Sequence, residues 1–246
     1  MTAVPVTPTA AAPISPVRRT LTVSRVLYLN WPMALAFPLG IMATSFIINI
    51  LIFAALGDAA AEGGTGGLAS LYIVQLIVCW QGMLQNFAFS VGLNVTRRAF
   101  YAASVLVATI QSVGYAVFLY GCALVERATD GWGVHLHFFD PLPVTHSFSP
   151  VTILVYAVPL LLISFLGLFL GAVNKRWGST GVFILAIVSI FVLGGIAALI
   201  TFLDGWPAVG HWLVARSWRS IAIGWSLIPA ALAAAGGWWV LRRTVP

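Results

Sequence analysis

Six amide side chains of this sequence could bind a ligand, because they lie inside long apolar stretches where an amide needs a polar partner. These candidates for a substrate path are Asn49, Gln75, Gln81, Gln85, Asn86 and Gln111. One stripe at helical spacing is formed by Gln75, Cys79, Gly82 and Asn86. Gln81 and Gln85 lie on a neighbouring stripe. Such side chains either form hydrogen bonds between helices or line a path for a substrate, and both interpretations stay open.

Side chains that commonly catalyse reactions are scarce. The four histidines lie outside the apolar stretches, at His135, His137, His146 and His211, and their spacing matches no common zinc pattern. The chain contains no Walker A loop, no GxSxG and no HExxH. Cys79 and Cys122 lie within apolar stretches and away from other metal-ligating residues, as core residues do. We therefore predict no catalytic residue, no metal and no cofactor in this chain.

Six apolar runs must position these side chains. They cover residues 33–56, 68–89, 99–125, 151–173, 181–203 and 221–241, and none contains a charged residue. Each run is long enough for a helix to cross a hydrocarbon core of about 30 Å. Only 7% of the residues are charged and 61% are hydrophobic, too few polar groups to cover a soluble domain. The sequence predicts an all-α integral membrane protein whose permease-like domain of six transmembrane helices covers residues 31–243.

The basic residues predict the orientation of these helices. With the N-terminus in the cytoplasm, the cytoplasmic side receives Arg18, Arg19, Arg25, Arg97, Arg98, Lys175, Arg176, Arg242 and Arg243. The outer side receives the remaining arginines, Arg127, Arg216 and Arg219, and all six acidic residues. This excess of positive charge predicts that both termini are cytoplasmic. Pairs of basic residues between apolar runs do not form the clustered basic face of a nucleic-acid-binding protein, so we expect no nucleic-acid partner.

Three segments outside the runs have distinct compositions. Residues 1–17 are rich in proline, alanine and threonine, which predicts a disordered cytoplasmic tail. Residues 18–30 are basic and predict a segment at the membrane interface. Residues 206–219 are aromatic and predict an interfacial or re-entrant segment before the last run. The many alanines and the preference for arginine over lysine indicate a GC-rich bacterial genome.

The turn GLNVTRRAFY between the second and third runs is the most specific segment. By itself it is a helix break followed by an arginine pair that fixes topology. It resembles the turn after span two of ABC exporter permeases of the type-2 family, including those of actinobacteria. The basic N-terminal segment, the six runs with both ends inside and the long outer stretch before the fourth run are also similar to that family. The resemblance implies that 18–30 is the elbow helix and 206–219 the element before span six.

The same resemblance implies that the turn forms a short coupling helix that docks on a separate ATP-hydrolysing subunit. The contact residues implied are Gly92, Leu93, Asn94, Val95, Thr96, Arg97, Arg98 and Phe100. ATP and magnesium are then expected on the ABC ATP-binding subunit, and a second permease chain would complete a homo- or heterodimer. The implied function is export of an amphipathic or apolar substrate across the cytoplasmic (inner) membrane, in which the lipid bilayer surrounds the chain.

Three other functions are alternatives to the exporter. A channel or secondary carrier subunit should have an ionisable group deep in the membrane or paired broken helices, which the runs lack. A membrane-embedded enzyme should have a catalytic set at one end of the spans, where only the outer histidines are available. A membrane assembly protein remains as an alternative, because it requires no particular residue pattern.

Overall fold

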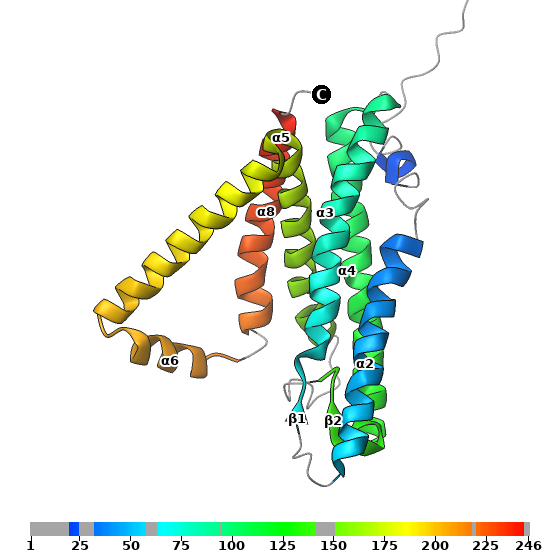
Figure 1. The fold of residues 1–246 in the computed structure, drawn as a ribbon, viewed down its shortest axis with the longest axis vertical. Helices are drawn as coiled ribbons and strands as arrows, with labels where there is room; N and C mark the ends of the chain where they lie inside the picture. Colours follow the sequence, from blue (N-terminus) through cyan, green and yellow to red (C-terminus); the bar gives the residue numbers. More distant parts are fainter. Residues whose placement is uncertain are drawn as a thin grey trace, which may run out of the picture.

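The computed structural model describes residues 20–24, 32–57, 63–93, 95–140, 151–217 and 220–243. These residues form a bundle of long helices with two very short strands at one end (Figure 1). In chain order the elements are η2 (Pro32–Ala36), α2 (Phe37–Leu56), β1 (Gly63–Gly64), η4 (Gly66–Leu68), α3 (Ala69–Gly92), α4 (Arg97–Ala128), η5 (Gly131–His135), β2 (Leu136–His137), α5 (Val151–Phe202), α6 (Trp206–Val214), η6 (Ile221–Trp225) and α8 (Ser226–Arg242).

Within the described residues, five helical segments are long and apolar enough to cross a membrane. They correspond to the predicted runs, except that the fourth and fifth runs are joined in the 52-residue helix α5. Gly178 interrupts the helical geometry of α5 with a φ of 67° and a ψ of −167°, a left-handed conformation that glycine adopts without steric cost. α5 therefore consists of two arms, residues 151–177 and 179–202. The first arm packs against α3, α4 and α8, and the second diverges from the bundle (Figure 1).

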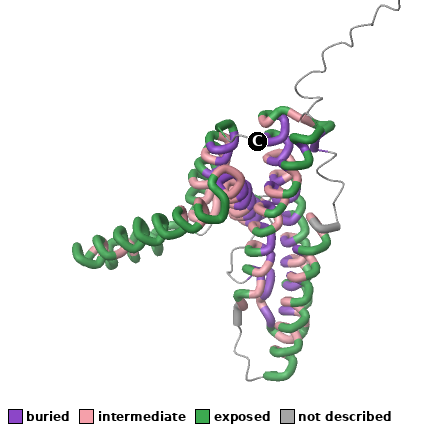
Figure 2. Tube along the Cα trace, turned by 45° about the horizontal axis from the view of Figure 1, so that its top comes forward, coloured by how far each residue is buried: buried purple, intermediate pink, exposed green. Residues whose placement is uncertain are grey.

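The distribution of polarity is the reverse of that in a soluble domain. Gln75, Ser112 and Ser164 have no exposed surface, whereas Leu51 is 64% exposed and Phe191 81% exposed. The second arm of α5 is exposed along almost its whole length, while buried residues lie along the inside of the bundle (Figure 2). Apolar side chains outside and hydrogen-bonded polar side chains inside are stable when the surrounding solvent is lipid.

Two glycines on the first arm of α5 allow α3 to approach closely. A Cβ atom on Gly167 would lie 2.5 Å from the carbonyl oxygen of Leu76, and one on Gly171 would lie 2.5 Å from the Cβ of Met83. The spacing is that of the small-xxx-small pattern by which helices associate in membranes. In the sequence, the signal for this contact is two glycines four residues apart in an apolar run.

The end of the bundle that holds β1 and β2 is closed by a cap around Glu126. β1 and β2 pair in parallel, with Gly63 opposite Leu136 and Gly64 opposite His137. One carboxylate oxygen of Glu126, Oε2, accepts hydrogen bonds from Trp132 Nε1 (3.1 Å) and from the backbone N–H groups of Phe138 (3.0 Å) and Phe139 (2.9 Å). Its Oε1 accepts from the Asp140 N–H at 3.1 Å. Glu126 thus fixes residues 132–140 onto the end of α4.

The sequence predicts the side of the membrane on which Glu126 lies but does not predict its burial. α4 continues to Ala128, beyond the predicted limit at residue 125, and the side chain of Glu126 turns back into the cap, where it is 1% exposed. A buried carboxylate is stable only when hydrogen-bond donors surround it, and the four N–H groups meet that requirement. Beside it, Arg127 Nη2 donates to Asp140 Oδ2 at 2.6 Å.

The remaining predicted segments are described in part. Residues 20–24 of the predicted interfacial segment 18–30 are helical, and the rest of that segment and the predicted tail 1–17 lie outside the described residues. In the segment predicted as interfacial or re-entrant, α6 forms a short helix with no buried residue. It lies crosswise to the long helices, at the far end of the second arm of α5 (Figure 1).

Candidate functional site

A cluster of neutral polar side chains occupies the middle of the bundle, where α3, α4 and α5 meet. Gln75 Nε2 donates to Ser164 Oγ at 3.0 Å and lies 3.5 Å from Gln111 Oε1. The hydroxyls of Ser112 and Ser164 are 3.1 Å apart. Gln75 comes from α3, Gln111 and Ser112 are neighbours on α4, and Ser164 comes from α5, so the cluster forms only when the three helices pack together. Its groups can bind water or a neutral polar group, and they supply no charge for acid–base chemistry.

The cluster extends to the backbone at the start of the first long helix. Pro38 has no N–H to donate to the carbonyl of Ala34, four residues earlier. Two side chains of α4 replace that donor, because Tyr115 Oη donates to Ala34 O at 2.8 Å and Gln111 Nε2 donates to it at 3.3 Å. In the membrane a helix containing proline is tolerated when neighbouring side chains satisfy the freed carbonyl. The carbonyl that Pro38 leaves free therefore connects the first helix to the polar cluster.

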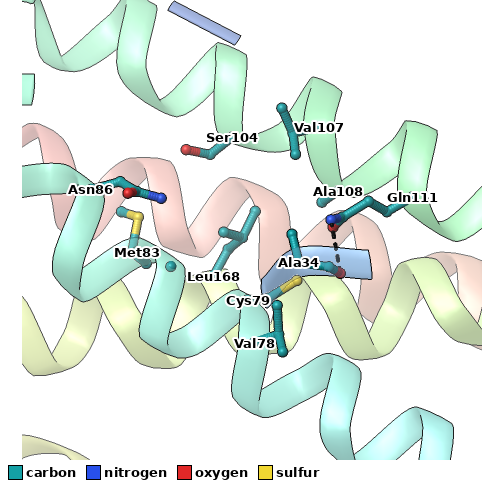
Figure 3. Close-up of a pocket in the computed structure, with 11 residues that line it drawn as sticks. Ala34, Val78, Cys79, Met83, Asn86, Ser104, Val107, Ala108, Gln111 and Leu168 are labelled. Carbon is teal, nitrogen blue, oxygen red and sulfur yellow. Dashed lines mark hydrogen bonds between the residues drawn. The ribbon is translucent and has the colours of Figure 1, made fainter. Parts of the chain in front are cut away.

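A small pocket lies beside the cluster (Figure 3). Its polar lining comes from Asn86 of α3 and from Ser104 and Gln111 of α4, with Ala34, Cys79 and Leu168 among the apolar residues. Its volume is about 80 Å³. That volume holds a few water molecules but is smaller than the 300–1,000 Å³ typical of organic ligand sites. A substrate larger than water would have to separate α3 from α4 before it could enter here.

The structure divides the six predicted substrate-path residues into three groups. Gln75 and Gln111 belong to the cluster, and Gln111 and Asn86 line the pocket beside it. Asn49 is half-buried and donates to the Ser45 carbonyl of its own helix at 2.8 Å. The exposed side of α3 carries the other two, Gln81 and Gln85, which do not line the pocket. Ser112, Ser164 and Tyr115 belong to the cluster but were missed, although a hydroxyl deep in an apolar run indicates such a role.

The turn expected to contact an ATPase lies at the opposite end from the cap. α3 ends at Gly92 and α4 begins at Arg97, so the described part of the turn contains no separate helix of its own. Thr96 caps α4, since its hydroxyl accepts from the Ala99 N–H at 3.3 Å. The described residues of the turn thus differ from the short coupling helix that the resemblance implies.

The side chains of this turn differ in exposure. Leu93 is 54% exposed and Val91 37%, while Gly92, Thr96 and Arg98 are also exposed. Phe100 is only 1% exposed, because its ring packs edge-on against Phe87 with centroids 5.4 Å apart. Val95 is half-buried against the same core. Asn94 lies outside the described residues. The exposed surface of the turn thus combines the apolar side chains of Val91 and Leu93 with the cationic side chain of Arg98.

Arg97 connects this turn to the last helix. Its Nη1 donates to the backbone carbonyl of Arg242 at the end of α8, at 3.5 Å. Carbonyls in the last turn of a helix have no partner within the helix and attract cations. The turn is therefore in contact with α3, α4 and α8 together, and a displacement of the turn would move all three helix ends.

The two histidines of the cap, His135 and His137, lie close to different carboxylates. His135 Nδ1 lies 3.4 Å from Asp130 Oδ2, and His137 Nδ1 lies 3.9 Å from Glu126 Oε1. Asp140 is paired with Arg127 instead. His211 is on α6, and His146 is outside the described residues. Among the residues that the structure describes, no group of three or more His, Cys, Asp or Glu side chains is placed to hold a metal ion.

Fold and polarity together define the class of this protein. It is an all-α, multi-pass membrane protein with an uncharged polar cluster inside its bundle. Comparison of the chain with protein-family models, with curated proteins and with solved structures finds no match.

Proposed function

We propose that this chain is the membrane-spanning permease subunit of an ATP-driven ABC exporter of the type-2 family. In this proposal the two arms of α5 are separate spans, which makes six, with both termini in the cytoplasm. The end carrying the turn between α3 and α4 faces the cytoplasm, and the cap faces outward. The chain has no catalytic residue of its own, and ATP with magnesium binds to a partner ATPase subunit.

The observation that carries the proposal is the exposed apolar surface of Val91 and Leu93 beside Arg98, on a turn that is bonded to α8 through Arg97. Exposed apolar groups at the end of a membrane helix are unfavourable in water, and a protein partner would cover them. A partner that moved this turn would shift three helix ends at once, which is the coupling that an ATP-driven permease requires.

A second permease chain is expected in the complete transporter. The second arm of α5 offers it an apolar face formed by Phe183, Ile187 and Ile190, with exposed fractions of 68%, 66% and 72%. These side chains recur at helical spacing and do not line the cleft between this arm and α8. Between two such chains, apolar helices would enclose a path for an amphipathic or apolar substrate.

The proposed topology can be tested by labelling single cysteines from each side of the membrane. In a background with Cys79 and Cys122 replaced, Ser179→Cys should react with an impermeant maleimide only when the cytoplasmic side is accessible. Asp130→Cys, at a side chain that is 87% exposed in the cap, should react from outside intact cells. The two positions lie on opposite ends of the bundle, so the charge distribution predicts opposite labelling. Labelling of both positions from one side would contradict six spans.

The contact with an ATPase is tested most sharply at Leu93. Leu93→Asp should leave the chain in the membrane at normal levels and weaken its binding to the ATPase about tenfold or more, because a carboxylate would be buried in an apolar interface. Val95→Asp is less suitable, since Val95 also packs against the core of this chain. The measurement is co-purification of a Walker A ATPase from native membranes, with its ATP turnover.

Val214→Asp is the matched control, since Val214 is 88% exposed on α6, away from the turn. This variant should retain the ATPase fully. If no Walker A protein co-purifies with the unmodified chain, or if Leu93→Asp retains it as well as Val214→Asp does, the exporter proposal is wrong.

A further inference from the structure

A large apolar cleft separates the second arm of α5 from α8, beneath the bend at Gly178. Its volume is about 620 Å³, within the range of organic ligand sites. One wall comes from the second arm, through Gly181, Ile184 and Val188, which share a helical face. The facing wall comes from Phe169 on the first arm and from Gly236 and Val240 on α8. The cleft is lined almost entirely by apolar groups, so its occupant within the membrane has a hydrocarbon part.

The rim of the cleft nearest the C-terminus is cationic. Trp177 and Trp239 line the cleft at this end, and each carries an arginine over its ring. The guanidinium carbon of Arg176 lies 4.5 Å from the ring centroid of Trp177, and that of Arg243 lies 4.5 Å from the ring centroid of Trp239. Tryptophan and arginine together are typical of the level of lipid headgroups. The cleft is thus apolar along its walls and positively charged at its rim. A phospholipid has the matching arrangement, with apolar acyl chains and a charged headgroup.

The guanidinium of Arg176, which lies over the Trp177 ring that lines this rim, has one nitrogen without a hydrogen-bond partner among the described residues. Nη1 of Arg176 is buried and makes no hydrogen bond within the described residues. A buried donor of a charged group is costly when it is unsatisfied, and a phosphate oxygen is the acceptor that guanidinium groups bind best. A second protein chain of apolar sequence would fill the walls but would leave this donor without an acceptor.

We propose that the cleft between the second arm of α5 and α8 binds an anionic phospholipid from the leaflet on the C-terminal side. Its acyl chains lie against Ile184, Val188 and Val240, and its phosphate accepts from Arg176 and Arg243. Under the topology proposed above, that leaflet is the cytoplasmic one. The site does not depend on the transport function, because it requires only the bend at Gly178, the apolar walls and the two arginines.

The test uses the full chain, purified in a neutral detergent, freed of lipid and titrated with palmitoyl-oleoyl phosphatidylglycerol or phosphatidylcholine. Native mass spectrometry gives the half-saturating concentration for each lipid. The unmodified chain should bind phosphatidylglycerol more tightly than phosphatidylcholine. Arg176→Gln and Arg243→Gln should each raise the half-saturating concentration of phosphatidylglycerol about fivefold and change that of phosphatidylcholine little. Ile184→Trp should weaken binding of both lipids by filling the cleft.

Two matched controls separate this site from general lipid adhesion. Arg216 also lies over a tryptophan, 5.7 Å from the Trp212 ring, but away from the cleft, so Arg216→Gln should leave binding unchanged. Phe183→Trp adds an indole to the outer face of the same arm and should also have no effect. Equal binding of the two lipids to the unmodified chain, or an equal loss with Arg216→Gln, would overturn the proposal. Full competition by glycerol phosphate would also overturn it. If Ile184→Trp breaks a dimer without changing lipid binding, the cleft holds a second copy instead.

Discussion

Replacement of Glu126 with alanine is expected to destabilise the protein by about 3 kcal/mol or more. The carboxylate is 1% exposed and accepts from three backbone N–H groups and one indole N–H. Alanine would leave these donors buried with no acceptor, and water could reach them only if residues 132–140 moved away from α4. We therefore expect a lower midpoint of thermal denaturation in detergent and faster proteolysis between residues 131 and 140 in intact membranes.

Asp130 provides the control for this prediction. It lies in the same cap and pairs with His135 at 3.4 Å, but its side chain is 87% exposed. Exposed polar contacts of this kind contribute little to stability, so Asp130→Asn, which suits the left-handed backbone at this position (φ 51°), should change the free energy of unfolding by less than about 0.5 kcal/mol. Similar denaturation midpoints for Glu126→Ala and the unmodified chain would show that the carboxylate does not hold the cap.

Alanine at Gly167 is the second substitution with a large expected effect. The added methyl group would lie 2.5 Å from the backbone oxygen of Leu76 and 2.8 Å from the Cβ of Cys79, and neither atom can move without shifting α3. Overpacking of this kind costs about 1–3 kcal/mol, and the rigid backbone contact places Gly167→Ala at the upper end of that range. The cluster around Gln75 and Ser164 lies at the same α3–α5 contact, so its hydrogen bonds should lengthen too.

Gly194, on the second arm of the same helix, gives a matched comparison. A Cβ atom there meets nothing within 4 Å, and alanine is the better helix former by about 1 kcal/mol. Gly194→Ala should therefore be neutral or slightly stabilising. The measurement is denaturation of both variants in the same detergent, together with their abundance in the membrane. A Gly167→Ala protein as stable as Gly194→Ala would contradict the close contact between α3 and α5.

The cap around Glu126 and the turn between α3 and α4 have different roles in the proposed transport cycle. The cap closes one end of the bundle with a buried carboxylate and paired strands, whereas the turn between α3 and α4 exposes apolar side chains at the other end. A signal that enters at the turn would reach the cluster around Gln75 along α3 and α4 before it reached the cap. Variants of Glu126 and of Leu93 should therefore be distinguishable, because the first changes stability and the second changes binding of the partner.

Much of the architecture could be predicted from the sequence, because membrane helices are set by local properties. The length of an apolar run and the cost of an unpaired backbone group are both readable residue by residue, so α2, α3, α4 and α8 coincide with predicted runs within a few residues. Thr96 before Arg97 is a local capping signal of the same kind. The charge pattern at the ends of these runs likewise predicts orientation without knowledge of packing.

The tertiary structure decided which polar residues meet. Gln75 and Gln85 look alike in sequence, yet Gln75 is fully buried against Ser164 and Gln85 is exposed on α3, because helix packing covers only one face. In the sequence Glu126 is only an acid at the end of the third run, and the backbone N–H groups that bind it belong to a loop 12 to 14 residues further on. The cleft beneath Gly178 depends on the angle between two arms of one helix, which the composition of each arm does not determine. Burial, partnership and cavities arise from contacts between distant segments, and hydrophobic periodicity reports only which face of each segment prefers lipid or protein.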